Sequence, residues 1–267
     1  MWEGNVDELK RKLRRLGMDV ATLAPLTEEG MSGIYTLTVP GAGAIAQWRR
    51  LREVVPQMGY WPVLLGGEQD LKMHREMLGD ADERTPGEII QQGVALNPHD
   101  WLAKQAEKWN DEAEEFSLDE YHGEWPGGNH ASTQFQTPNH YPGKRKSVLN
   151  LFGKQKPELY LGLVPASQGW EVPAPLRLGG WNDCPPPEVH VSFMRYWHDS
   201  YGAELVAATH DVVEMQVARP PTTREGALSL AMEQFFYCGD VVTQGTETLE
   251  RLAATLLKGT VWFFWWD

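Results

Sequence analysis

The last eight residues, TVWFFWWD (260–267), restrict the fold more than any other stretch of this chain. Side chains alternate between the two faces of a strand, so Val261, Phe263 and Trp265 point to one face and the aromatic residues between them to the other. Both faces are then apolar, which is typical of a strand covered on both sides. We therefore expect a buried C-terminal strand at the centre of a sheet.

Asp267 is the exception in this apolar stretch, because it carries a carboxylate. A negative group beside an aromatic wall must reach water or find hydrogen-bond donors. Two interpretations remain open. Either the carboxylate lies at the mouth of a pocket lined by tryptophan, or Asp267 is a frayed terminus.

The second half of the chain alternates between strand and helix patterns. Proline near the first turn and glycine after the last mark helix ends, as at Pro187 and Gly202, and Thr222 with Glu225 predicts a capping box. The expected elements are a strand at 158–166, a short helix at 174–184, a helix at 187–202, paired strands at 203–208 and 211–218, and helices at 220–238 and 246–259.

The first half shows the same mixture of patterns. A second capping box, formed by Thr85 and Glu88, predicts a helix start. Helices in mixed order with strands and an expected hairpin indicate an α+β fold, with a mixed, mainly antiparallel sheet flanked by helices. The expected elements are a helix at 5–16, a strand at 33–39, a helix at 44–55, a strand at 60–67 and helical structure over 68–117.

A change in composition divides the chain. Residues 121–147 are rich in glycine, proline, asparagine and histidine and show little periodicity, which predicts a long loop or linker. The predicted organisation is an N-terminal α/β region at 1–120, this linker, and a C-terminal α+β domain at 148–267.

The formal net charge of -13 and the pI near 5.1 describe an acidic protein. A general nucleic-acid binder needs a basic surface that displaces counterions from phosphate, and the only dense basic runs are at 10–15 and 144–146. We therefore expect no nucleic-acid partner. The acidity instead favours association with a basic protein. The sequence leaves the oligomeric state open.

The two cysteines, Cys184 and Cys238, are far apart and form no CxxC pair. This pattern fits a reducing compartment and excludes a cysteine-rich zinc site. The N-terminus lacks the apolar core of a signal peptide, and no stretch approaches the roughly 18 apolar residues of a membrane span. We expect a soluble, cytoplasmic protein with no membrane partner.

Four motifs near the C-terminus resemble DUF4253, a bacterial family of unknown function. They are PPTT (220–223), AxExFxYCxD (231–240), QG (244–245) and FWWD (264–267). GGWND (179–183) resembles a further family element, although Asp183 and Gly239 replace a glycine and a proline of the family pattern. The segment 48–66 resembles the N-terminal part of longer members. The resemblance implies one compact module over 158–267 and implies no activity.

These motifs also single out a candidate site. Cys238 follows a helix, whose negative end raises a thiol pKa, so a buried structural cysteine is the simpler interpretation. Asp240 is interpreted as the cap of the following turn. Glu233 lies off the apolar stripe of its helix and is either solvated or part of a shared polar site. The candidate pocket residues are Trp181, Asn182, Glu233, Cys238, Asp240, Gln244, Trp266 and Asp267.

No cofactor or metal is predicted. His122, His130 and His140 share the central loop, but their spacing matches no metal motif. HExxH, GxSxG and the P-loop pattern are absent from the sequence. GAGAIA (41–46) lacks the full GxGxxG pattern and is interpreted as a turn.

Three hypotheses of function follow. The first is a non-catalytic interaction protein, such as an immunity or accessory protein that neutralises a basic partner. It is favoured by the acidity, the missing catalytic motifs and the aromatic content. The alternatives are a hydrolase-type enzyme with a site around Glu233, Asp240 and Asp267, and a small-ligand binder with a tryptophan-lined pocket.

Overall fold

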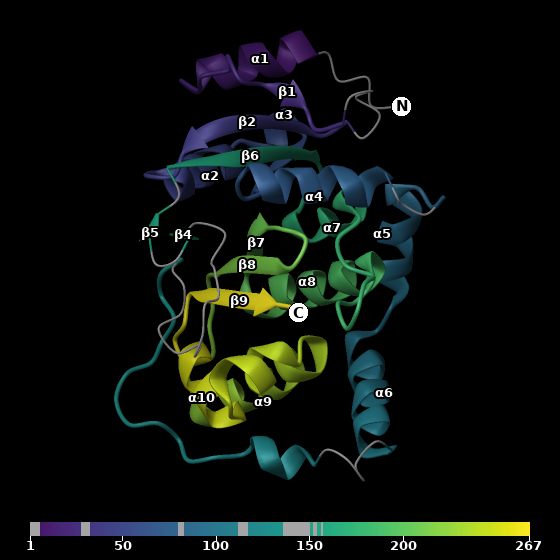
Figure 1. Ribbon diagram of the computed structural model, residues 1–267, viewed down its shortest axis with the longest axis vertical. Helices are drawn as coiled ribbons and strands as arrows, with labels where there is room; N and C mark the ends of the chain where they lie inside the picture. Colours follow the sequence, from purple (N-terminus) through teal and green to yellow (C-terminus); the bar gives the residue numbers. More distant parts are fainter. Residues whose placement is uncertain are drawn as a thin grey trace.

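The fold is seen in a computed structural model (Figure 1). The structure describes residues 6–27, 33–79, 83–111, 117–135, 150–151, 154–155 and 157–267. His140, the basic run at 144–146 and much of the predicted linker lie outside these residues. Helices flank a mixed sheet, which confirms the predicted α+β class.

The described strands form one seven-stranded sheet in the order β1-β2-β6-β3-β7-β8-β9. All neighbouring pairs are antiparallel except β3 and β7, so the sheet is mixed and mainly antiparallel, as predicted. The strands are β1 (Ala24–Pro25), β2 (Tyr35–Pro40), β3 (Tyr60–Leu64), β6 (Glu158–Pro165), β7 (Ala203–Ala208), β8 (Val212–Val217) and β9 (Val261–Trp265); β4 (Asn150–Leu151) and β5 (Lys154–Gln155) form a separate pair.

Strand β6 lies between β2 and β3 and is antiparallel to both. Strands β2 and β3 are therefore parallel to each other, and the helices α2 (Ala44–Arg52) and α3 (Val55–Met58) connect them. Trp48 of α2 donates a hydrogen bond to the Pro62 carbonyl of β3 at 2.9 Å. The predicted regions 1–120 and 148–267 thus contribute strands to one sheet, and their division into domains stays a prediction.

The predicted helical stretch at 68–117 contains three helices in the structure: α4 (Glu68–Gly79), α5 (Pro86–Ala95) and α6 (Pro98–Asp111). The capping box of Thr85 and Glu88 opens α5, as predicted. The other described helices are α1 (Val6–Arg15), η1 (Leu118–Tyr121), η2 (Gly169–Glu171), α7 (Pro173–Leu176), α8 (Pro187–Tyr201), α9 (Arg224–Tyr237), the π-helix η3 (Val241–Thr246) and α10 (Leu249–Leu256). No described helix has the length and apolar character needed to cross a membrane.

Two local predictions are wrong. The hydroxyl of Thr223, and not that of Thr222, caps α9 by accepting a hydrogen bond from the Gly226 amide at 3.1 Å. The helix expected at 174–184 ends at Leu176. Arg177 and Gly179 then have positive φ angles, so the chain leaves the helix in a left-handed turn.

Strand β9 lies at an edge of the sheet, which corrects the predicted central position. All five of its residues are nevertheless buried. Its outer edge is covered in part by a loop, because the Val261 amide donates to the Ser132 carbonyl at 3.1 Å. Alternation in the sequence reports that both faces are covered, but it does not report how many neighbouring strands there are.

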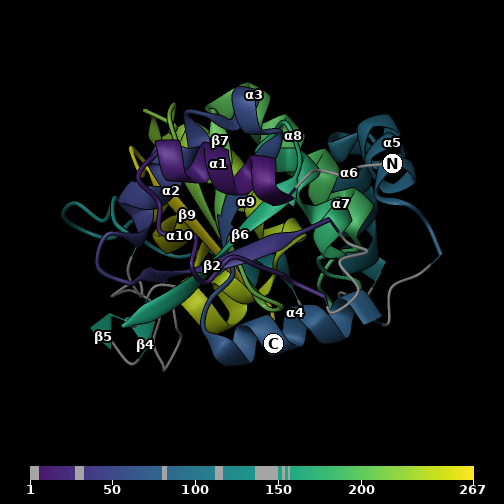
Figure 2. The same cartoon turned by 90° about the horizontal axis from the view of Figure 1, so that it is seen from above.

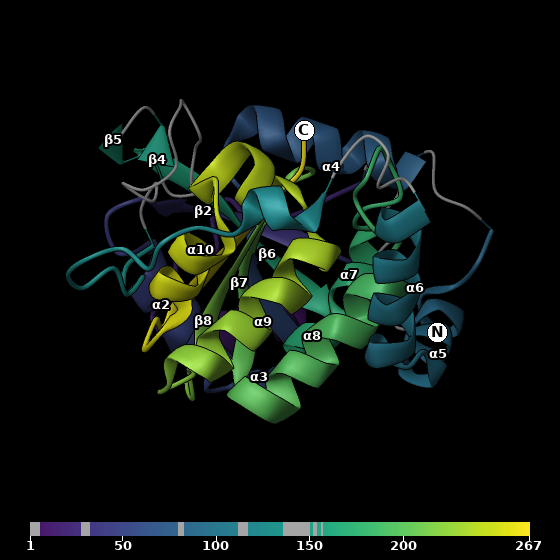
Figure 3. The ribbon, with the colours of Figure 1, turned by 90° about the horizontal axis from the view of Figure 1, so that it is seen from below.

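Two aromatic residues of β9, Trp262 and Phe264, pack against α8 and α9, which lie side by side in Figure 3. Trp197 of α8 is fully buried and stacks on Phe264 with ring centroids 5.3 Å apart. Its ring also makes edge-on contacts with Trp262 at 5.7 Å and Tyr237 at 4.9 Å. The C-terminal strand is therefore part of the core, on the face covered by α8 and α9.

We expect Trp197→Ala to lower the free energy of unfolding by about 3–5 kcal/mol, because it leaves a cavity between α8 and β9. Chemical denaturation measures this change. Val94→Ala is the control, since Val94 is 43% exposed. A loss no larger than that of the control would contradict the central role of Trp197.

Candidate functional site

Four of the predicted site residues meet at the C-terminal end of β9, and we call them the chain-end cluster: Asn182, Asp240, Gln244 and Asp267. The Asp240 carboxylate accepts hydrogen bonds from the Asp267 amide at 2.9 Å and from the Gln244 side chain at 2.7 Å. The Asn182 side-chain amide donates to the Asp267 carbonyl at 3.1 Å. Asp240 therefore binds the chain end and makes no side-chain cap of η3, contrary to its interpretation as a turn cap.

Cys238 and Trp266 lie next to this cluster but face the core. The Cys238 thiol donates to the Trp265 carbonyl at 3.0 Å, and the Trp266 amide donates to the Asp211 carbonyl at 3.0 Å. Both side chains are buried. Burial raises the pKa of the Cys238 thiol, so desolvation more than the helix dipole keeps it protonated.

Glu233 belongs to a different place. Its carboxylate accepts hydrogen bonds from the Tyr196 hydroxyl at 3.2 Å and from the Trp197 indole at 3.4 Å, both on α8. Burial raises the pKa of Glu233, and these hydrogen bonds offset the rise only in part. Glu233 thus links α9 to α8 and makes none of the contacts that join the chain-end cluster.

The two described histidines of the central loop, His122 and His130, have different partners. His122 pairs with Glu250 of α10 at 2.9 Å, and the Gly123 amide donates to the same carboxylate at 2.7 Å. Partial burial alone would raise the pKa of Glu250, but these hydrogen bonds outweigh it and lower the pKa. His130 contacts the Gly127 carbonyl. Among the described residues, no three His, Cys, Asp or Glu side chains are placed to hold a metal ion.

A buried thiol and imidazole lie close together beneath the loop that carries GGWND. The Cys184 sulfur is 3.5 Å from Nε2 of His190, and Nδ1 of His190 contacts the Tyr237 hydroxyl. Burial lowers the pKa of His190 to about 3 and raises that of the Cys184 thiol. Both groups are therefore neutral near pH 7. The sequence offered no signal for this contact, because a Cys and a His six residues apart fit no motif.

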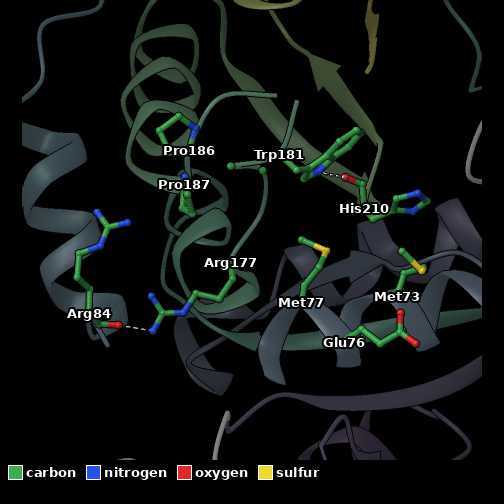
Figure 4. A pocket seen from close by; sticks show the side chains of 11 residues that line it. Met73, Glu76, Met77, Arg84, Arg177, Trp181, Pro186, Pro187 and His210 are labelled. Atoms are coloured by element: carbon green, nitrogen blue, oxygen red, sulfur yellow. Dashed lines mark hydrogen bonds between the residues drawn. The ribbon is translucent and has the colours of Figure 1, made fainter. Parts of the chain in front are cut away.

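A cavity of about 650 Å³ opens beside the same loop (Figure 4). Its size is within the range of small-molecule sites. Helix α4, the segment before α5, the loop between α7 and α8 with the first residue of α8, and the turn between β7 and β8 all contribute to it. Its lining residues are Met73, Glu76, Met77, Arg84, Arg177, Gly179, Gly180, Trp181, Pro186, Pro187 and His210.

The pocket has an apolar part and a cationic part. Met73, Met77 and Trp181 supply apolar surface, and the Trp181 indole donates to the His210 carbonyl at 3.2 Å, which fixes the ring. Figure 4 shows Arg84 and Arg177 on the same side of the pocket, with the Arg177 guanidinium directed to the Arg84 backbone and the Arg84 side chain extending away from Arg177. Arg177 donates a hydrogen bond to the Arg84 carbonyl.

Ion pairing holds Arg84 in place, since its guanidinium lies 3.2 Å from the Glu188 carboxylate of α8. Of the predicted candidates, only Trp181 lines this pocket. The other lining residues come from segments far apart in the sequence, so no spacing pattern could have predicted them.

The shape of the pocket depends on glycine in the loop. Gly179 and Gly180 have φ angles of 84° and 82°, which L side chains rarely adopt. A Cβ on Gly179 would lie 1.9 Å from the Pro185 carbonyl oxygen and 2.5 Å from Nε2 of His190. A Cβ on Gly180 would meet no atom within 4 Å. Gly179 therefore closes the pocket over the buried histidine.

This is an α+β protein with a solvent-accessible pocket at one end of α8 and an aromatic C-terminal strand. Residues 160–267 match the model of DUF4253, a domain of unknown function, which confirms the resemblance to that family over this part of the chain. The match begins within β6 and includes the GGWND loop, α8, α9 and the chain-end cluster, whereas α4 and Arg84 lie outside it. Comparison with curated proteins and with solved structures gave no match.

Gly179→Ala and Gly180→Ala form a matched pair. Each adds a methyl group at a positive φ, at a cost of about 1–2 kcal/mol. Gly179→Ala should lower the free energy of unfolding by about 1–3 kcal/mol more, because its Cβ also overlaps the Pro185 carbonyl. Urea denaturation measures both values. Equal losses would mean that the loop does not close over His190 as described.

The buried histidines predict acid sensitivity. Burial lowers the pKa of His74 to about 4 and that of His190 to about 3, from 6.5. Because the folded pKa values are depressed, the unfolded state binds protons first, and stability is lost as the pH falls below 6.5. The expected slope is about 1.4 kcal/mol per pH unit for each histidine.

His74→Gln should remove one of these two contributions between pH 6 and about 4, since glutamine does not titrate. The measurement is the free energy of unfolding from urea curves at a series of pH values. An unchanged slope in His74→Gln would show that His74 is already protonated in the folded protein.

Proposed function

We propose that this protein is a non-catalytic binding protein, and that the pocket beside the GGWND loop takes a small molecule with a flat apolar part and an anionic group. The observation that carries the proposal is the presence of both kinds of surface in one cavity of about 650 Å³. The indole of Trp181 and the side chains of Met73 and Met77 suit an apolar ring, because thioethers adapt to aromatic faces.

The arginines suit the anionic group. A guanidinium presents parallel donors that match a carboxylate or a phosphate. The residues that line the pocket include two guanidiniums, of Arg84 and Arg177, and one carboxylate, of Glu76, and Arg84 is also paired with Glu188. The N-terminal end of α8 adds a partial positive charge at Pro187.

The protonation states favour binding over catalysis. The thiols of Cys184 and Cys238 are buried, and burial raises the pKa of each. A protonated thiol is a poor nucleophile. Glu233 bonds to α8 and not to Asp240 or Asp267, so the carboxylates of the hydrolase hypothesis do not form one hydrogen-bonded group.

A second candidate is the interaction protein that the sequence suggested, an immunity or accessory protein that binds a basic partner. The uneven surface charge supports it: Asp119, Glu120 and Glu124 are exposed on the teal segment at the foot of Figure 1. A bacterial origin and a cytoplasmic location belong to this proposal, and the two buried free cysteines fit a reducing compartment.

The pocket is tested by filling it. We expect aromatic carboxylates and nucleoside monophosphates, screened as probes, to include compounds that raise the melting temperature of the wild type. Met77→Trp should abolish that increase by occupying the cavity. Met232→Trp is the matched control, since Met232 is also half-buried but lies on α9 outside the pocket.

Stabilisation that survives Met77→Trp would place the ligand elsewhere. If no probe stabilises the wild type, small-molecule binding of this class is wrong and the interaction protein becomes the leading candidate. Co-purification with a basic protein encoded by a neighbouring gene, lost on Asp119→Lys with Glu120→Lys, would then support that second candidate.

A further inference from the structure

Basic side chains concentrate in two helices at one end of this acidic protein. Of the 24 lysines and arginines in the chain, five lie in α1 and three in α2. Figure 2, which looks down on this end, shows α1 nearest the viewer with α2 beside it. These residues are Lys10, Arg11, Lys12, Arg14 and Arg15 in α1, and Arg49, Arg50 and Arg52 in α2.

Some of these cations are used within the fold. Lys12 pairs with Glu8 at 3.2 Å, and Arg52 pairs with Glu204 while its guanidinium lies 4.7 Å from the Trp61 ring centre. Arg49 donates to the Gln216 side chain at 3.1 Å. Lys12 also donates to the Gln57 carbonyl at 2.9 Å, and Arg11 donates to the Asp7 carbonyl at 3.4 Å.

Arg14, Arg15 and Arg50 are exposed, and within the described residues none of them makes an ion pair or a side-chain hydrogen bond. We call these three the basic face. Arg50 of α2 reaches the C-terminal end of α1, where Arg14 and Arg15 lie: a Cβ on Gly17 would lie 3.5 Å from a guanidinium nitrogen of Arg50. The α1 dipole favours Arg14 and Arg15 in its last turn, but it does not explain Arg50, which comes from another helix.

We infer that the basic face is a docking surface for an acidic segment of a partner protein. Three exposed guanidiniums at the junction of two helices can each bind a carboxylate through paired N–H donors. The chain carries a formal net charge of -13, so the basic face offers an acidic segment a local attraction that the protein as a whole does not. This surface is separate from the pocket and does not depend on the proposed function.

The surroundings favour a peptide over a nucleic acid. Asp19 and Glu53 are exposed within a few residues of the three arginines, so the positive surface is short and bounded by acids. Nucleic acids carry a continuous line of phosphates and need a longer basic track. An acidic peptide can place single carboxylates against the arginines while avoiding the neighbouring Asp19 and Glu53 of this protein.

The surroundings also disfavour a membrane. The apolar side of α1 is buried, with Leu9 and Leu13 in the core, so the helix has no apolar face to insert into lipid. Among the described residues, the only exposed large hydrophobic side chain is Val94 on α5. Three cations alone bind an anionic membrane weakly.

The test compares three labelled probes on the full chain: polyglutamate, duplex DNA and vesicles that contain phosphatidylserine. Polyglutamate should bind the wild type with an affinity that falls as salt is added. The charge-reversal variant Arg14→Glu, Arg15→Glu, Arg50→Glu should weaken this binding at least about tenfold. Fluorescence anisotropy measures the peptide and the DNA, and co-sedimentation measures the vesicles.

The matched control is Lys72→Glu, Lys104→Glu, Lys108→Glu, which changes the net charge equally at exposed positions of α4 and α6. It should bind polyglutamate within about threefold of the wild type. If both variants lost the same affinity for polyglutamate, net charge alone would explain the effect, and the inference would be overturned. Failure of the wild type to bind polyglutamate, or tighter binding of DNA or vesicles, would also overturn it.

The neutral variant Arg14→Gln, Arg15→Gln, Arg50→Gln is a control for a folding defect in the charge-reversal protein. Circular dichroism and thermal unfolding check that each variant is folded. A folded neutral variant with weakened polyglutamate binding supports the basic face, and one that binds as the wild type does contradicts it.

Discussion

The insertion of β6 between β2 and β3 is the constraint on which the rest of the structure depends. Its backbone pairs with Tyr35–Pro40 on one side and with Tyr60–Leu64 on the other. The strand needs glycine at its middle, because a Cβ on Gly162 would lie 2.7 Å from the Leu65 side chain. Strand β3 then joins β6 to β7, so residues from the first quarter of the chain connect two parts of the region that matches the family model.

Much of the local structure was predictable from the sequence because its signals are local. Proline and glycine set the ends of α8, and a capping box set the start of α5. The strand pair of β7 and β8 followed from two apolar runs around a short turn. The edge position of β9 was not predictable, because side-chain alternation describes two faces and the order of strands depends on contacts between distant segments.

The candidate site shows the same difference between features set by local sequence and features that depend on distant segments. The motifs of the C-terminal half contained Asp240, Gln244 and Asp267, and the structure joins these three by hydrogen bonds. The pocket was missed except for Trp181, since Arg84 and Met77 reach it from elements about a hundred residues away in the chain. The nearness of Cys184 to His190 also needed coordinates. Sequence spacing predicts chemistry where one helix or loop supplies the groups, and fails where the fold assembles them.

The loop contact at Ser132 has a consequence for the behaviour of the protein in solution. A sheet edge with free amide and carbonyl groups is a template for pairing with another chain, and β9 is an edge rich in aromatic residues. The Ser132 carbonyl occupies the Val261 amide, and the Ser132 amide is itself bonded to the Thr255 carbonyl at 2.9 Å. A short loop bonded to α10 thus occupies an amide at the start of this edge strand, so a second chain cannot pair with that amide unless the loop moves away.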